Sequence, residues 1–199
     1  MTIQKVLVIG AGQMGSGIAQ VCAQAGFDVK LNDMKEEYFQ RGLANITKNL
    51  SRNVEKGRMT DEEKSQVLSR ITKSLDLNDA SDVDLVIEAA VENMEIKQKI
   101  FKQLDEITPK HAILASNTSS LPITEIAAAT NRPAQVIGMH FMNPVPVMKL
   151  VEIIRGLATT DDVYTSIEEM TKKLGKVPVE VNDFPGFVSN RILMPMINE

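Results

Sequence analysis

Residues 5–15 read KVLVIGAGQMG, and this stretch decides the fold class. Lys5–Ile9 is a short apolar run, which is typical of a strand buried on both faces. Three glycines follow, Gly10, Gly12 and Gly15, and apolar residues at helical spacing begin directly after them. A strand, a glycine-rich turn and a helix in this order form the fingerprint of a dinucleotide-binding βαβ unit.

Each glycine of this fingerprint has its own steric task. Gly10 allows the tight turn, Gly12 lets the backbone approach a pyrophosphate, and Gly15 permits close packing of the helix on the sheet. The free N–H groups of the first helical turn, at Gln13 and Met14, would hold the phosphates. By itself the motif is weak evidence, because a tight strand–helix turn without a ligand can carry the same letters.

A carboxylate at the end of the second predicted strand strengthens the dinucleotide interpretation. Asp28–Asn32 is that strand, and Asp33 follows it at roughly the 20-residue offset of the acidic residue that binds the ribose hydroxyls. The same carboxylate would repel a 2′-phosphate, and no arginine follows at Met34 or Lys35 to neutralise one. The pattern therefore favours NAD over NADP, although Lys35 keeps the preference from being absolute.

The rest of the chain alternates between buried strands and helices. Predicted strands follow at 83–87, 112–115, 135–139, 148–154 and 177–181, and predicted helices at 35–56, 60–70, 93–107, 122–130 and 164–174. The helix from 35 is expected to be long and exposed, and Thr60 with Glu63 forms a capping box for the next one. Short connections in this alternation predict an α/β fold with a doubly wound, mostly parallel sheet.

Pro185-Gly186 marks the predicted domain boundary. Residues 1–184 are expected to form the dinucleotide-binding domain, and residues 185–199 the first helix of an incomplete, truncated C-terminal helical domain. The helix predicted over 187–197 carries too many apolar residues for a surface helix without a partner.

Composition excludes several classes of function. The 199 residues carry a formal net charge of −4, so the chain has no general basic surface for nucleic acid or an anionic membrane. Its one cysteine, Cys22, lies on the apolar face of a predicted helix, which favours inert packing and a reducing compartment. No transmembrane run is present, and a strand begins within a few residues of Met1. We expect a cytoplasmic protein without a signal or transit peptide.

Proton-transfer chemistry points to one of the two histidines. His111 lies in a polar lead-in and is expected to be exposed, whereas His140 ends the predicted strand 135–139, at the sheet edge where ligands bind. Glu152 interrupts an apolar run, where a charge is costly unless it is paired. If the proline-marked loop turns the chain back, the carboxylate would reach the imidazole and orient it. The alternative is a strand glutamate that points to solvent.

Three longer runs carry a resemblance to a known family. They are SNTSSLPI from 116, HFMNPVPVMKLVEII from 140 and DFPGFVSNRI from 183. In this order they resemble the 3-hydroxyacyl-CoA dehydrogenase family, and the resemblance extends from Lys5 to Glu199. It implies a Rossmann-type domain followed by a helical domain that forms a homodimer. It also implies NAD-dependent interconversion of a short-chain 3-hydroxyacyl-CoA and its 3-ketoacyl-CoA.

The resemblance assigns roles to four catalytic positions. His140 would be the general acid/base on the 3-oxygen, and Glu152 its orienting partner. Ser119, in the hydroxyl-rich loop at 116–120, would hydrogen-bond the substrate oxygen, and Asn190 would help to hold the acyl group. That loop also has a plainer interpretation, a helix cap followed by a turn.

The binding positions follow from the same resemblance. Glu92, Lys97 and Asn143 match positions that contact the cofactor. Lys56 corresponds to a lysine that contacts CoA, and Asn49 stands where animal enzymes have a CoA-associated serine. Since much of the acyl pocket would belong to further helices, we expect a chain ending at Glu199 to bind NAD but to show little dehydrogenase activity.

Two other functions remain open on the sequence. One is a hydroxyacid dehydrogenase, such as a 3-hydroxyisobutyrate or sugar-acid dehydrogenase, that uses a catalytic lysine. The other is a non-catalytic dinucleotide-binding relative, like the lens crystallins of the family. The pairing of His140 with Glu152 argues against the first, and the intact set with Ser119 and Asn190 argues against the second.

Overall fold

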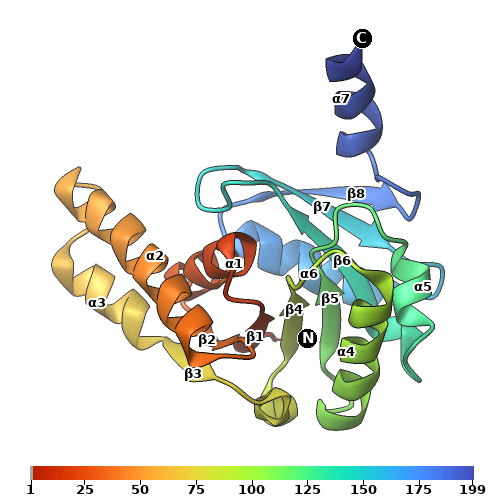
Figure 1. Ribbon diagram of the computed structural model, residues 1–199, viewed down its shortest axis with the longest axis horizontal. Helices are drawn as coiled ribbons and strands as arrows, with labels where there is room; N and C mark the ends of the chain where they lie inside the picture. Colours follow the sequence, from red (N-terminus) through yellow and green to blue (C-terminus); the bar gives the residue numbers. More distant parts are fainter. Residues whose placement is uncertain (1) are drawn as a thin grey trace.

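The computed structural model describes residues 2–199, which form one eight-stranded sheet with the order β3-β2-β1-β4-β5-β6-β7-β8 (Figure 1). The strands are β1 Lys5–Ile9, β2 Asp28–Asn32, β3 Ile71–Ser74, β4 Leu85–Glu88, β5 Ile113–Ser116, β6 Val136–Phe141, β7 Leu150–Arg155 and β8 Val177–Asn182. All pairs are parallel except β6 with β7. The predicted doubly wound, mostly parallel fold is confirmed.

Helices cover both faces of the sheet. They are α1 Gln13–Gln24, α2 Glu36–Glu55, α3 Asp61–Ser69, α4 Met94–Ile107, α5 Ile123–Ala127, α6 Asp161–Lys173 and α7 Ser189–Asn198, with 3-10 turns η1 Leu77–Asp82 and η2 Pro133–Gln135. Alternate residues of β1 belong to two separate apolar clusters, because successive side chains of a strand point to opposite faces. Helices α1, α2 and α6 contribute to one cluster, and α4 and α5 to the other.

Two predictions about the outer elements need correction. The sequence does not predict β3, because this edge strand has only one apolar residue, Ile71, and two of its four residues are exposed. Helix α2 is not exposed on every side: Phe39, Ile46 and Leu50 form a buried stripe at helical spacing. The capping box of α3 is confirmed, since Thr60 and Glu63 exchange hydrogen bonds of 2.8 and 3.1 Å.

The strand order creates a switch point between β1 and β4. Connections from these neighbouring strands lead to opposite sides of the sheet, which leaves a crevice at their carboxyl ends, where ligands bind in folds of this type. The loops that follow β1, β4, β5 and β6 all lie along this edge because the strands are parallel. Among the sequence-derived candidate residues, Ser119, His140 and Glu152 come from these loops and from the strands beside them.

Strand β6 is longer than predicted. It extends through Phe141, which pairs with Val151 of β7, so His140 lies within the strand and does not follow it. The antiparallel return through the Asn143–Pro144 loop places His140 directly opposite Glu152 in the register. The conditional prediction that the chain turns back here is therefore confirmed.

Helix α7 stands apart from the body of the molecule (Figure 1). It begins at Ser189, later than predicted, because Phe187 has a φ of 50° and is not helical. None of its residues is buried, and the apolar ones among them are exposed: Ile192, Leu193, Met194, Met196 and Ile197. Within residues 2–199 no helix is long and apolar enough to cross a membrane.

Candidate active site

In the glycine-rich loop, the fold requires a glycine at two positions but not at a third. A Cβ on Gly10, whose φ is 95°, would lie 2.6 Å from the carbonyl oxygen of Ala89, and a Cβ on Gly15 would lie 1.7 Å from that of Gly10. Both clashes involve backbone, so these glycines are required for folding. A Cβ on Gly12 would meet nothing within 4 Å. The space beside Gly12 is open, as a loop that receives a pyrophosphate requires.

The start of α1 is free to bind an anion. Gly12 caps the helix without any side-chain hydrogen bond, and its first turn carries no acidic residue. The N–H groups there keep the positive end of the helix dipole. Because no carboxylate competes for these donors, the residues present fit the phosphates of a dinucleotide.

Asp33, which follows β2, is hydrogen-bonded to the glycine-rich loop. Its Oδ2 accepts a hydrogen bond of 2.7 Å from the backbone N–H of Ala11, and its Oδ1 accepts one of 2.7 Å from that of Met34. The carboxylate is thereby fixed next to the glycine turn, where a ribose diol would lie in this fold. Nearby, Gln13 donates a hydrogen bond of 3.1 Å to Asn143, which joins two residues predicted separately as cofactor contacts.

His140 and Glu152 form a buried pair at the centre of the site. Nδ1 of His140 lies 2.7 Å from Oε2 of Glu152, and the two residues are only 6% and 2% exposed. An ionised carboxylate can only accept, so Nδ1 carries the proton and Nε2 is left as the basic nitrogen. The alternative of a solvent-facing Glu152 is wrong. Burial alone would raise the pKa of Glu152, but hydrogen bonds from His140 and Ser189 bring it below its usual value.

Nε2 of His140 is the atom that this pair offers to a ligand. Within residues 2–199 it has no hydrogen-bond partner, and every fully buried side-chain nitrogen or oxygen there has one. Nε2 is therefore reachable from solvent. A base with one nitrogen held by a carboxylate and the other open is the arrangement that general acid/base catalysis needs.

The 116–120 loop is held by Glu92. One carboxylate oxygen accepts hydrogen bonds from the Thr118 hydroxyl at 2.5 Å, the Ser119 N–H at 2.9 Å and the Ser120 N–H at 3.2 Å. From the other side, the Asn190 amide donates a bond of 2.9 Å to the Ser119 carbonyl. The structure thus brings together Glu92, Ser119 and Asn190 and leaves the Ser119 side chain exposed.

Lys97 lies behind this loop, deeply buried. Its Nζ is 2.7 Å from Glu88 Oε1 and 3.5 Å from Glu92 Oε2, and its side chain is only 1% exposed. Glu88, fully buried at the end of β4, also accepts a bond of 2.7 Å from the Ser116 hydroxyl. Lys97 therefore braces Glu92 and the end of β4 from the inside of the protein.

The two predicted CoA-binding residues lie on another element. Lys56 ends α2, exposed at the far end of the projecting α2–α3 pair (Figure 1), and Asn49 lies within α2 and donates a bond of 3.4 Å to Gln20. No hydrogen bond or ion pair among residues 2–199 joins either of them to His140 or Glu152. Lys48 and Arg52 are exposed on the same helix, so it presents local positive charge.

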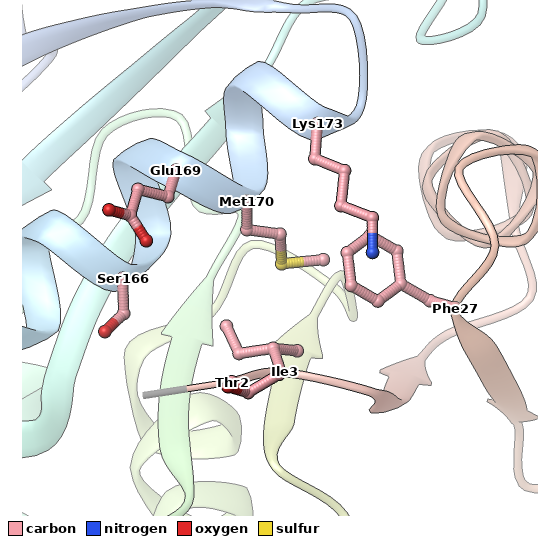
Figure 2. A pocket seen from close by; sticks show the side chains of 7 residues that line it. All are labelled: Thr2, Ile3, Phe27, Ser166, Glu169, Met170 and Lys173. Atoms are coloured by element: carbon pink, nitrogen blue, oxygen red, sulfur yellow. The ribbon is translucent and has the colours of Figure 1, made fainter.

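Other features lie away from this site. A cavity of about 190 Å³ opens between α6 and Phe27, and Lys173 lies over the Phe27 ring at 4.3 Å (Figure 2). It is at the amino end of β2, the edge opposite the glycine loop, and no candidate residue lines it. Burial raises the pKa of the Cys22 thiol to about 12, which confirms inert packing. Residues 2–199 hold no cluster of side chains suited to a metal ion.

Comparison with known proteins identifies the family of this chain. Residues 5–184 match the family model described as 3-hydroxyacyl-CoA dehydrogenase, NAD binding domain. The chain belongs to this family. The predicted resemblance and the choice of NAD as cofactor are confirmed.

The relatives extend the match to the whole chain. A Bacillus subtilis protein named probable 3-hydroxybutyryl-CoA dehydrogenase is 59% identical over 199 residues, 100% of this chain and 69% of its own length. The 3-hydroxybutyryl-CoA dehydrogenase of Bradyrhizobium diazoefficiens is 55% identical, over 99% of this chain and 67% of its own. The crystal structure of (S)-3-hydroxybutyryl-CoA dehydrogenase from Ralstonia eutropha is 49% identical, with a TM-score of 0.97 over 99% of this chain and 70% of that one.

Sequence reasoning missed three residues of the site. Ser189 contacts Glu152, Phe187 packs against His140, and Glu88 holds Lys97. Glu88 carried the same signal as Glu152, a carboxylate within an apolar run. Ser189 and Phe187 lie in a run quoted for its resemblance, but nothing in their local pattern indicates what they contact.

Proposed function

We propose that this chain interconverts a short-chain 3-hydroxyacyl-CoA and the corresponding 3-ketoacyl-CoA, with 3-hydroxybutyryl-CoA and acetoacetyl-CoA as the substrate pair. The observation that carries the proposal is the buried pair of His140 and Glu152, 2.7 Å apart, with Nε2 of the imidazole open. The names of the relatives support the choice of substrate.

In the oxidation, Nε2 of His140 takes the proton of the 3-hydroxyl group. Glu152 holds Nδ1–H and stabilises the imidazolium that forms, without itself taking the proton. Bound NAD supplies the hydride-accepting nicotinamide. The Ser119 hydroxyl and the Asn190 side chain keep the oxygen in line with Nε2, and positioning of this kind lowers the barrier by removing the entropy of orientation.

The same proposal assigns the cofactor contacts. The N–H groups at Gly12, Gln13 and Met14 hold the pyrophosphate, and Asp33 binds the ribose hydroxyls. Glu92 and Asn143 would contact the bound cofactor. Lys97 acts on the cofactor through Glu92, because its ammonium group is buried between two carboxylates.

We further propose residues 1–184 as the NAD-binding domain and 185–199 as the first helix of a helical domain that forms a homodimer. The family match, which ends at 184, and the exposed apolar residues of α7 support this division. Lys56, with Lys48 and Arg52, attracts the phosphates of CoA to α2. Asn49 is a weaker candidate for CoA, since its amide already meets Gln20.

Loss of NADH absorbance with acetoacetyl-CoA, measured on a protein that also carries the proposed helical domain, tests the proposed function. Turnover with acetoacetyl-CoA and none with a 3-hydroxyisobutyrate or sugar-acid substrate is the expected result. A non-catalytic relative would bind NADH and turn over neither substrate. Either this outcome or a preference for the other hydroxyacids would refute the proposal.

Glu152→Gln is expected to lower kcat about tenfold, because the amide oxygen still accepts from Nδ1 but the bond loses the strength that the charged acceptor gives it. Loss of the negative charge also removes a group that favours the imidazolium, so the acid limb of the pH–rate profile moves to lower pH. The profile of kcat/KM for oxidation measures this shift. Glu180→Gln, an exposed glutamate on β8, is the control and should leave the limb in place. An acid limb that does not move in Glu152→Gln would show that the carboxylate does not act on His140.

Replacing Asp33 with serine and Met34 with arginine is expected to relax the cofactor preference toward NADPH. The change removes a carboxylate that repels a 2′-phosphate and adds a guanidinium that binds one, which should raise the ratio of NADPH to NADH affinity at least about tenfold. Fluorescence titration gives both dissociation constants, and Met34→Arg alone separates the two contributions. Equal binding of both cofactors by the unchanged protein would mean that Asp33 does not select NAD.

A further inference from the structure

The segment 183–190 connects β8 to the start of α7 and is anchored at its first residue. The Asp183 carboxylate accepts hydrogen bonds of 2.8 Å from the Ile123 N–H, 2.7 Å from the Thr124 N–H and 2.6 Å from the Thr124 hydroxyl. These bonds tie the end of β8 to the start of α5. The residues that follow therefore leave the sheet from a fixed point.

Phe187 brings this segment onto the imidazole. It is a non-glycine residue with a φ of 50°, a conformation that is costly for a bulky side chain. Its ring is nevertheless buried, with its centroid 5.8 Å from that of His140 and the two rings tilted by 57°. The unusual backbone turns the chain so that the next residues reach Glu152.

Ser189, the first residue of α7, donates hydrogen bonds to the oxygen of Glu152 that does not contact His140. Its backbone N–H lies 2.8 Å and its hydroxyl 2.9 Å from Oε1, while Nδ1 of His140 lies 2.7 Å from Oε2. With two donors on Oε1, the carboxylate cannot rotate without breaking bonds on both sides. The adjacent Asn190 binds the Ser119 carbonyl, so the same helix start touches both halves of the site.

We propose that Ser189 is a positioning residue for catalysis: its hydroxyl holds Oε1 of Glu152 so that Oε2 stays aligned with Nδ1 of His140. This rests on the function proposed above. Because both donors of Ser189 favour an ionised carboxylate, they also keep Glu152 from taking the Nδ1 proton of His140 when Nε2 becomes protonated. The placement of α7 thereby controls how well the base is oriented.

Ser189→Val and Ser189→Thr test the proposal as a matched pair, because the two side chains have the same shape and only threonine keeps the hydroxyl. The valine variant should lose about tenfold in kcat, the value of a hydrogen bond to a charged group, with KM for NADH unchanged. The threonine variant should recover most of that loss. Equal kcat in the valine variant and the unchanged protein, or equal loss in both variants, would overturn the proposal.

A second measurement does not depend on turnover. The His140 ring proton, held on a carboxylate at 2.7 Å, should give a low-field proton resonance in the NADH complex. With only two histidines in the chain, exposed His111 is the internal reference. The resonance should shift or broaden in Ser189→Val and persist in Ser189→Thr, and an unaltered resonance in the valine variant would refute the role.

If the valine variant fails to fold, Ser189→Ala replaces it in both measurements. Absence of turnover in the unchanged protein that carries the helical domain would instead count against the proposed function.

Discussion

His140→Gln is expected to lower kcat at least about 100-fold while NADH still binds, because the variant loses the group that we propose transfers the proton. Glutamine has no basic nitrogen in the position of Nε2, yet its amide can still hydrogen-bond Glu152. The cofactor contacts at the glycine loop are on other strands and stay intact. Single-turnover reduction of acetoacetyl-CoA and fluorescence titration of NADH measure the two quantities separately.

His111→Gln is the matched control for this experiment. His111 is exposed and lies 3.3 Å from Asp84, on the amino side of β5 and away from the site. Its replacement should leave kcat unchanged. A His140 variant that retained most of its kcat would remove this residue from proton transfer and leave the exposed hydroxyls of the 116–120 loop to be tested.

Lys97→Met is expected to lower the free energy of unfolding by about 3–5 kcal/mol, the cost of removing one partner of a buried ion pair. Lys97 and Glu88 are 1% and 0% exposed, so the Glu88 carboxylate would remain in the interior without its counterion. Urea denaturation of the NAD-free protein measures the change. Because Lys97 also contacts Glu92, weaker NADH binding should accompany the loss of stability.

Lys99→Met provides the comparison on the same helix. Lys99 is exposed on α4, and a surface substitution of this kind should change stability by no more than about 0.5 kcal/mol. Adding Glu88→Gln to Lys97→Met removes the uncompensated charge and should restore part of the lost stability. Equal stabilities for the two lysine variants would mean that the buried pair contributes nothing to the folded state.

Local patterns were sufficient for the fold and for part of the site. The alternation of apolar strands and amphipathic helices is a short-range property, and it predicts each strand of the sheet except β3. The glycine spacing in 10–15 is equally local, since the steric requirement at Gly10 arises within one turn of chain and its neighbouring strand. A charge in an apolar run requires a partner, which is why Glu152 could be paired with His140.

Longer-range contacts were beyond the sequence because they depend on how separate elements meet. Ser189 contacts Glu152 across 37 positions in the chain, two residues after the turned backbone at Phe187. The burial of Lys97 between Glu88 and Glu92 likewise depends on how α4 packs at the end of β4.

The sequence by itself thus determined the α/β architecture, the dinucleotide loop and the pairing of His140 with Glu152, because periodicity, glycine sterics and the cost of an unpaired charge act over short distances. Only the tertiary structure decided which oxygen of Glu152 faces His140, what holds the other one, and that Lys97 supports the site from within. Those features are set by the packing of α4, β7 and α7 against loops distant in the chain, where the geometry of several elements must be known together.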